Sequence, residues 1–206
     1  MIKNELLMIF TKNPEAGKVK TRLAKDLGND KALEIYKFLL YHSHKVTAPL
    51  KINKEVHYSS NIPESDLWST GSFEKKLQIE GDLGEKMEAA FQQGFKNAYR
   101  KIIIIGTDMF DISSEDIRNA FQELDKHDYV IGPAEDGGYY LLGMKSLNSD
   151  LFKNKEWSTS SVFEDSIKDM RQAEVKVLPV KNDIDVLDDI KDHPAFQKFI
   201  KYDRQN

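Results

Sequence analysis

Short apolar runs alternate with stretches of helical periodicity along this chain. Residues 6–10 form an uninterrupted apolar run followed by the turn-like pair Asn13 and Pro14, which predicts a buried parallel strand. Four consecutive isoleucines within residues 101–106 predict a central strand covered on both faces. Further strands are predicted at residues 55–59, 76–80, 129–132, 139–144 and 175–180.

Between these runs, apolar residues recur at the spacing of amphipathic helices. Leu33, Tyr36 and Leu40, for example, fall on one helical face. Helices are predicted at residues 20–27, 30–46, 83–98 and 117–124, after residue 161, and in the tail from residue 186 with a break at residue 194. Two helix starts have the spacing of a capping box, Ser113 with Asp116 and Ser161 with Glu164.

This order of elements predicts the fold class. Strands and helices in alternation indicate βαβ units, which build a mostly parallel sheet with helices on both faces. The 206 residues contain no internal repeat, low-complexity stretch or long linker, so we expect a single domain over residues 1–206.

Composition excludes several classes of protein. The absence of cysteine excludes disulfides and metal sites ligated by cysteine. A net charge of −4 argues against a general nucleic-acid binder, and no apolar run approaches the ~18 residues of a membrane span. The first residues do not resemble a signal peptide. We therefore expect a soluble cytoplasmic protein with neither a nucleic-acid partner nor a membrane span, and the sequence favours no oligomeric state.

The candidate chemistry follows the strands, because ligands of open α/β sheets bind beyond the carboxyl ends of the strands. The loop after the first strand carries four cations and leads into a helix: Lys12, Lys18, Lys20 and Arg22. Cations close to the N–H groups at a helix start suit a phosphate group. The loop is not a Walker A loop, because Val19 stands where that motif has Ser or Thr. A solvated basic turn is the alternative, because lysine-rich turns are common.

Carboxylates follow two later strands. Asp108 comes directly after the isoleucine run, and its oxygens suit Mg²⁺ or Mn²⁺. The alternative is that Asp108 only caps the next helix. Asp183 and Asp185, after the last strand, would lie on one face of an extended segment and suit a metal there. Their alternative role is to complement the dipole of a helix start.

An acidic, glycine-rich turn lies between the strands predicted at 129–132 and 139–144. It contains Glu135, Asp136, Gly137 and Gly138. The glycines would let a ligand approach the backbone, with Asp136 contacting the ligand or a metal. A plain hairpin turn with exposed acids is the alternative. Cations after the first strand and acids after later ones, at one edge of the sheet, together suit a metal–nucleotide complex.

Six segments that occur in order resemble those of a known family. They are residues 10–14 (FTKNP), 17–23 (GKVKTRL), 81–87 (GDLGEKM), 106–108 (GTD), 133–143 (PAEDGGYYLLG) and 183–185 (DID). The set resembles a bacterial family of GT-A-type transferases, usually described as glycosyltransferases and associated with radical-SAM and selenodomain proteins. Two of the segments also resemble those of phospholactate guanylyltransferases and, more distantly, molybdenum-cofactor guanylyltransferases.

The resemblance implies the nucleotide-diphospho-sugar transferase fold, a three-layer α/β/α sandwich with a mixed, mainly parallel sheet. It also implies a divalent metal, Mg²⁺ or Mn²⁺, on Asp108 with Asp185 as a second ligand. Lys20 and Arg22 would contact phosphate, and residues 135–138 would form the substrate loop. The other residues for which nucleotide binding is implied are Lys12, Lys18, Asp82, Gly84 and Thr107.

Two segments depart from the pattern of that family. Phe110 stands where the family usually has proline, and Val186 with Leu187 replaces the usual Thr-Pro. These changes affect the loops around Asp108 and Asp185 and leave the expected metal ligands in place.

We expect a metal-dependent transferase that moves a glycosyl group from a sugar nucleotide to a small acceptor. Asp108 would hold the metal at the leaving diphosphate, Lys20 and Arg22 would share its charge, and Asp136 would orient or deprotonate the acceptor. The first alternative is a nucleotidyltransferase, in which an acceptor phosphate attacks a nucleoside triphosphate and pyrophosphate leaves; the cationic first loop favours it. The second alternative is a non-catalytic nucleotide-binding protein, which would be expected to lack these acids.

Overall fold

The strands form one mixed sheet. A computed structural model describes residues 3–69 and 72–200. Its strands are β1 (Lys3–Thr11), β2 (Asn53–Tyr58), β3 (Glu74–Leu77), β4 (Tyr99–Ile105), β5 (Tyr129–Pro133), β6 (Tyr139–Met144) and β7 (Val175–Val177). They lie in the order β3-β2-β1-β4-β6-β5-β7, and every neighbouring pair is parallel except the two that include β6. The predicted mainly parallel sheet is confirmed.

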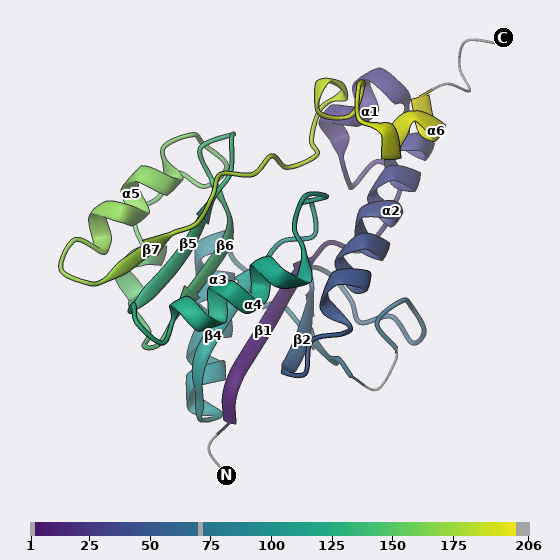
Figure 1. Cartoon of the computed structure of the whole chain (residues 1–206). Helices are drawn as coiled ribbons and strands as arrows, with labels where there is room; N and C mark the ends of the chain where they lie inside the picture. The colour runs from purple at the N-terminus through teal and green to yellow at the C-terminus, as the bar shows by residue number, and fades with distance from the viewer. Residues whose placement is uncertain (1–2, 70–71, 201–206) are drawn as a thin grey trace, which may run out of the picture.

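Helices cover both faces of this sheet. On one face, α2 (Asn29–Thr47) and α4 (Ser114–Glu123) share a core with Leu7 and Ile9 of β1. On the other, α3 (Leu83–Lys96) and α5 (Val162–Asp169) share a core with Leu6 and Met8. Figure 1 shows α2 and α4 in front of the strands and α3 behind them. Because successive side chains of a strand point to opposite faces, β1 serves both cores, and the predicted three layers are confirmed.

Three details differ from the sequence predictions. The capping box predicted for Ser161 and Glu164 is wrong: Ser161 has φ −89° and ψ −14°, so its hydroxyl does not cap α5, whereas Ser113 and Asp116 form the predicted box on α4. Strand β7 ends at Val177, shortly before Pro179, which has no N–H to pair.

The third difference concerns the tail from residue 186, which is not one helix. It consists of two 3₁₀ turns, η2 (Leu187–Asp189) and η3 (Pro194–Phe196), followed by α6 (Gln197–Ile200). The first turn is closed by the Asp189 carboxylate, which accepts the N–H groups of Asp185 and Val186, both at 2.7 Å. These bonds cap the start of the first turn, and Pro194, which lacks an N–H, prevents a continuous helix through the tail.

The strand order reverses beside β1, which has β2 on one side and β4 on the other. The two neighbours of β1 are parallel to it, and Ile9 lies opposite both Val56 and Ile105. The loops that follow β1 and β4 therefore leave the sheet side by side. This is the topological switch point at which α/β sheets bind ligands.

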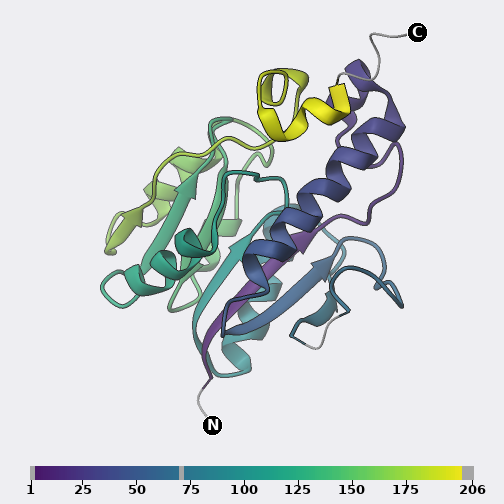
Figure 2. The same ribbon diagram turned by 45° about the vertical axis from the view of Figure 1, so that its right-hand side comes forward.

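The end of the described chain crosses back over this edge of the sheet. From β7 it runs along the carboxyl ends of the strands to α1 (Thr21–Leu27) and α2, as Figures 1 and 2 show from two directions. There Ile184, Ile190 and Phe196 pack in a core with Leu23 of α1 and Ile35 of α2. The tail thereby closes one side of the switch point.

Phe110 anchors the loop after β4 in this same core. Its ring lies 5.4 Å from Phe38, 4.6 Å from His42, 5.1 Å from His193 and 5.0 Å from Phe196, measured between ring centroids. The departure from proline at this position thus has a structural reason, because the aromatic ring joins the loop that carries Asp108 to α2 and to the tail.

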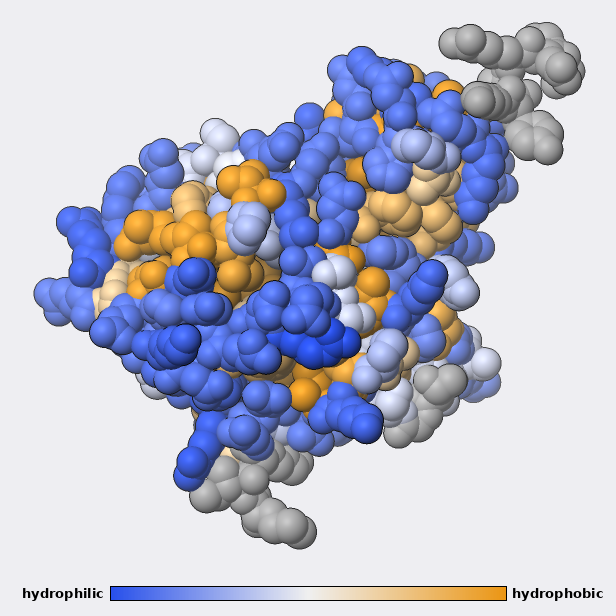
Figure 3. Space-filling view, viewed as in Figure 1, coloured by the Kyte–Doolittle hydropathy of each residue, from blue (hydrophilic) through white to orange (hydrophobic). Residues whose placement is uncertain are grey.

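The face seen in Figure 1 is mostly hydrophilic, with apolar side chains gathered over β5, β6 and β7 (Figure 3). Exposed large apolar side chains in and after the edge strand β7 are Val177 and Val180. None of the helices within residues 3–69 and 72–200 is long and apolar enough to cross a bilayer.

Replacing Phe110 with alanine is expected to lower the free energy of unfolding by about 2 kcal/mol, less than for a fully buried ring because Phe110 is only half-buried. Urea unfolding followed by circular dichroism measures this change. Phe110→Leu keeps most of the apolar volume and should lose less than half as much. Equal midpoints for Phe110→Ala and the unchanged protein would show that the ring does not anchor the loop.

Candidate active site at the switch point

An ion pair with a buried ammonium and a half-exposed carboxylate joins the loop after β1 to the loop after β4. Lys20 Nζ lies 2.8 Å from Asp108 Oδ1; the lysine side chain is 4% exposed, and the aspartate side chain is 48% exposed. Burying an ammonium group is unfavourable unless a carboxylate accompanies it, so the pair fixes both loops. Within the part of the chain that the structure describes, Asp108 Oδ2 has no hydrogen bond, and this oxygen is available to a ligand.

Lys20 reaches this position through an unusual backbone conformation. Its φ of 48° and ψ of 44° place it in the left-handed region at the residue preceding α1. A non-glycine residue there is strained by roughly 1 kcal/mol, and such strain is common where the structure positions a functional side chain. The turn directs the ammonium inward, to Asp108, instead of into solvent.

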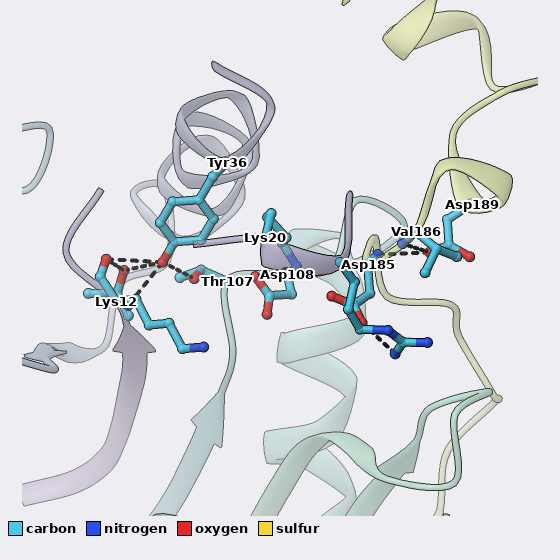
Figure 4. A network of polar contacts seen from close by, with 10 residues as sticks. Lys12, Lys20, Tyr36, Thr107, Asp108, Asp185, Val186 and Asp189 are labelled. Carbon is cyan, nitrogen blue, oxygen red and sulfur yellow. Dashed lines mark hydrogen bonds and ion pairs between the residues drawn. The ribbon is translucent and has the colours of Figure 1, made fainter. Parts of the chain in front are cut away.

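The hydroxyl of Tyr36 fastens the same two loops together. It accepts a hydrogen bond from the Lys12 N–H at 2.9 Å and donates to the Lys12 carbonyl at 3.0 Å. It also lies 3.2 Å from Thr11 Oγ1 and 3.3 Å from Thr107 Oγ1, the residue before Asp108. Figure 4 shows this network beside the Lys20–Asp108 pair. Burial, with a smaller contribution from the charge of Asp108, raises the pKa of Tyr36 to about 12, so the hydroxyl keeps its proton.

The tail contributes a further carboxylate to this site. Asp183 forms a single antiparallel bridge with Met109, and the Ile184 N–H donates to the Asp108 carbonyl at 3.0 Å. Burial first, and then the negative charges of Asp136 and Asp108, raise the pKa of Asp183 to about 6, against the opposite effect of Lys20. Asp183 is thus close enough to Asp108, Asp136 and Lys20 for the charges of all three to act on it.

Arg22 and Asp185 pair with each other. Arg22 Nη1 lies 2.7 Å from Asp185 Oδ2, and the arginine side chain is 66% exposed. Asp185, the predicted second metal ligand, is therefore held by a cation, whereas Asp183 feels the charges of Asp108 and Asp136. The pair ties α1 to the tail, and Figure 4 shows Asp185 of this pair near Asp108.

The other predicted cations lie on the surface of the first loop. Lys12 is exposed, although its backbone is held by Tyr36. Lys18 is also exposed, and its ammonium pairs with Glu15 at 2.6 Å. The structure therefore brings Lys20 to the carboxylates and leaves Lys12 and Lys18 at the rim of the loop.

The predicted substrate loop is a tight turn between β5 and β6. Asp136 Oδ1 accepts the Gly138 N–H at 2.8 Å, and Asp136 itself is exposed. Gly137 has φ 88°, and a Cβ there would lie 2.2 Å from the Ser160 carbonyl oxygen. The neighbouring chain segment therefore requires a glycine here, and the approach of a ligand to its backbone stays a prediction. Glu135 is exposed at the same turn.

Asp82 and Gly84, predicted to bind nucleotide, both have structural contacts. Asp82 caps α3, where its carboxylate accepts the Glu85 N–H at 2.9 Å. A Cβ on Gly84 would lie 2.6 Å from both the Phe152 carbonyl oxygen and the Trp157 ring. These contacts explain both residues without a ligand, and their nucleotide contacts stay a prediction.

The donors at this site fit Mg²⁺ or Mn²⁺ in their chemistry. The carboxylates of Asp108, Asp136 and Asp183 outnumber the buried ammonium, so a divalent cation would balance their charge. No group of three His, Cys, Asp or Glu side chains in residues 3–69 and 72–200 is arranged to hold an ion. A metal would therefore complete its shell with water or phosphate oxygens, as Mg²⁺ commonly does.

One residue of this site, Tyr36, is missed by sequence reasoning. Its spacing is that of an apolar helical stripe, and nothing in that spacing shows that its hydroxyl reaches two strand ends. Asp183 and Asp185 are both candidates from their spacing, and the resemblance alone favours Asp185 as the second metal ligand.

Comparison with known proteins places the chain in a family. The model described as "Uncharacterized protein conserved in bacteria (DUF2064)" matches residues 43–159, more than half of the chain. The chain belongs to this family. No curated protein matches it. The association with radical-SAM and selenodomain proteins, and the likeness to guanylyltransferases, stay predictions.

Solved structures confirm the fold of this DUF2064 member. A protein from Desulfovibrio desulfuricans G20, provisionally described as a nucleotide-diphospho-sugar transferase, has 31% identity and a TM-score of 0.83, over 94% of this chain and 90% of that one. The 4-diphosphocytidyl-2C-methyl-D-erythritol synthase of Anaerococcus prevotii DSM 20548 has 11% identity and a TM-score of 0.61, over 95% and 96% of the two chains. Rv0371c of Mycobacterium tuberculosis H37Rv, in complex with manganese, has 11% identity and a TM-score of 0.53, over 93% and 97%. The predicted nucleotide-diphospho-sugar transferase fold is therefore correct.

Tyr36→Phe removes the hydroxyl of the network and keeps the ring. It should lower the free energy of unfolding by about 1–2 kcal/mol, because the Lys12 N–H and carbonyl lose their partner. It should also weaken nucleotide affinity severalfold, measured by calorimetry, because the two loops are no longer fastened. The matched control is Tyr140→Phe, which removes a hydroxyl bonded to the Pro179 carbonyl at 3.2 Å and outside the Tyr36 network. Equal nucleotide affinities in the two variants would contradict a positioning role for Tyr36.

Proposed function

We propose that this protein is a transferase that uses a nucleotide-activated donor, with glycosyl transfer from a sugar nucleotide as the first candidate reaction. The observation that carries the proposal is the Lys20–Asp108 pair at the switch point, with Asp136 and Asp183 close enough to act on each other's charge. The likeness to a protein provisionally described as a nucleotide-diphospho-sugar transferase supports the choice of donor.

In this proposal each residue acts on a different part of the substrates. Asp108 presents its exposed oxygen to the donor, and Lys20 holds that carboxylate in place while adding positive charge beside the diphosphate. Asp183 joins Asp108 in holding Mg²⁺ or Mn²⁺, in preference to Asp185, which Arg22 already holds. When bound, such a cation would neutralise part of the negative charge of the diphosphate. Asp136, exposed on the turn after β5, orients the acceptor and receives its proton.

Nucleotidyl transfer is the second candidate, and the exposed Lys12 of the first loop favours it. A triphosphate carries more negative charge than the diphosphate of a sugar nucleotide, and one further cation at the rim would meet it. In that reaction a phosphate of the acceptor attacks the α-phosphorus and pyrophosphate leaves.

A thermal-shift panel separates these candidates. Nucleoside triphosphates and sugar nucleotides are added to the protein with Mg²⁺, with Mn²⁺ and with a chelator, and the rise in Tm reports binding. A sugar nucleotide that raises Tm more than its matching triphosphate, only with metal, supports glycosyl transfer. The reverse order would replace it with nucleotidyl transfer, and no rise with any member would contradict both.

Asp108→Asn should reduce metal-dependent nucleotide affinity at least about tenfold, equivalent to ~1.4 kcal/mol, while the amide oxygen still accepts a hydrogen bond from Lys20. Calorimetry with the best nucleotide of the panel measures the loss. The matched control is Asp111→Asn, which removes the same charge from an exposed position of the same loop. Unchanged affinity in Asp108→Asn would remove Asp108 from the site.

A further inference from the structure

A separate cavity lies between α2 and the loop that follows β2. Its volume is about 410 Å³, within the ~300–1,000 Å³ typical of small-molecule sites. Buried side chains in its lining are Leu40, Tyr58 and Trp68, and exposed ones are Lys12, Lys37 and Tyr41. The lining is thus apolar and aromatic inside, with the exposed lysine Lys37 of α2 at the mouth.

The cavity wall is held in place by the protein itself. Asn13 donates to the Asn61 carbonyl at 2.8 Å and accepts the Ser60 N–H at 3.1 Å, which fixes the loop after β2 against the loop after β1. The Trp68 ring rests on His44 and Phe73, with centroid distances of 5.4 and 5.0 Å. A cavity whose walls are fixed in this way requires little ordering when a ligand binds.

The charge at the mouth is positive. Asp66, the acid in the lining, is paired with Lys75 at 2.8 Å and accepts a hydrogen bond from the Tyr58 hydroxyl. The ammonium groups of Lys12 and Lys37 have no acidic partner within residues 3–69 and 72–200. Tyr41, which is 59% exposed, adds an aromatic surface beside them. An anionic group at the mouth and an aromatic body inside would satisfy both parts of the lining.

This cavity is distinct from the candidate active site. Its lining includes none of the carboxylates of that site, nor Lys20. The two share only the end of β1, through Thr11 and Lys12, whose backbone groups are held by Tyr36.

We propose that the cavity binds a small aromatic anion, with its ring beside Tyr41 and over the wall formed by Tyr58 and Trp68, and its carboxylate or phosphate group at Lys37. This second site goes beyond the proposed transfer reaction, because it requires neither a nucleotide nor a metal.

Fluorescence of Trp68 tests the proposal directly. The second tryptophan, Trp157, lies against Gly84 of α3, so Trp157→Phe leaves Trp68 as the reporter. Benzoate and phenyl phosphate are titrated without nucleotide or metal, alongside benzyl alcohol and inorganic phosphate. Saturable changes with the two aromatic anions, at least about fivefold tighter than with the neutral alcohol and absent with inorganic phosphate, are expected. Calorimetry on the unsubstituted protein repeats the measurement if Trp157→Phe does not fold.

Substitutions at the mouth then place the ligand. Lys37→Ala and Tyr41→Ala change exposed side chains of α2, so both variants should fold, and each should weaken benzoate and phenyl phosphate at least about fivefold. Lys45→Ala, an exposed lysine of the same helix outside the lining, is the matched control and should bind as the unsubstituted protein does. No saturable binding of either aromatic anion, or equal binding by Lys37→Ala and Lys45→Ala, would overturn the proposal. Nucleotide affinity is measured on the same variants, so that loss of aromatic-anion binding can be distinguished from loss of nucleotide binding at the candidate active site.

Discussion

A single ion pair, between an ammonium buried at the start of α1 and a half-exposed carboxylate after β4, is the constraint around which the carboxyl edge of this sheet is organised. An ammonium in the protein interior needs its partner, so the loop after β1 cannot move away from the loop after β4 without exposing or isolating that charge. The left-handed backbone of Lys20 is retained because it is the conformation that makes the contact. Tyr36 and the tail then fasten the same loops from two further directions.

Much of this arrangement follows from the order of elements in the sequence. The isoleucine run identifies β4 as a central strand, and a carboxylate placed directly after a central strand emerges at the ligand-binding edge. The cations after β1 reach the same edge because β1 and β4 are parallel neighbours. Strand periodicity therefore predicted that Lys20 and Asp108 would meet, although it gave no indication which of the four cations would be the buried one.

The remaining contacts depend on side chains that meet across long stretches of chain. Tyr36 has the spacing of a core residue, and its hydroxyl finds Thr107 only once α2 has packed on the sheet. Phe110 looked like a departure from a loop pattern, whereas it is a packing residue whose partners come from α2 and the tail. The pattern predicts that Gly137 lets a ligand approach the backbone, whereas the structure shows that a side chain there would clash with the backbone of Ser160. Local patterns carry no information about such tertiary neighbours.

The bridge between Met109 and Asp183 joins the loop after β4 to the tail, so the site depends on segments that are far apart in the sequence. The acids of the site come from segments that lie far apart along the chain and converge only when the sheet, α1 and the tail are all assembled. Occupancy of the site is therefore linked to global unfolding, and a ligand bound there would protect amide hydrogens throughout the central strands from exchange, as well as those of the surrounding loops. Because the site exists only in the folded protein, binding of a ligand there raises the free energy of global unfolding.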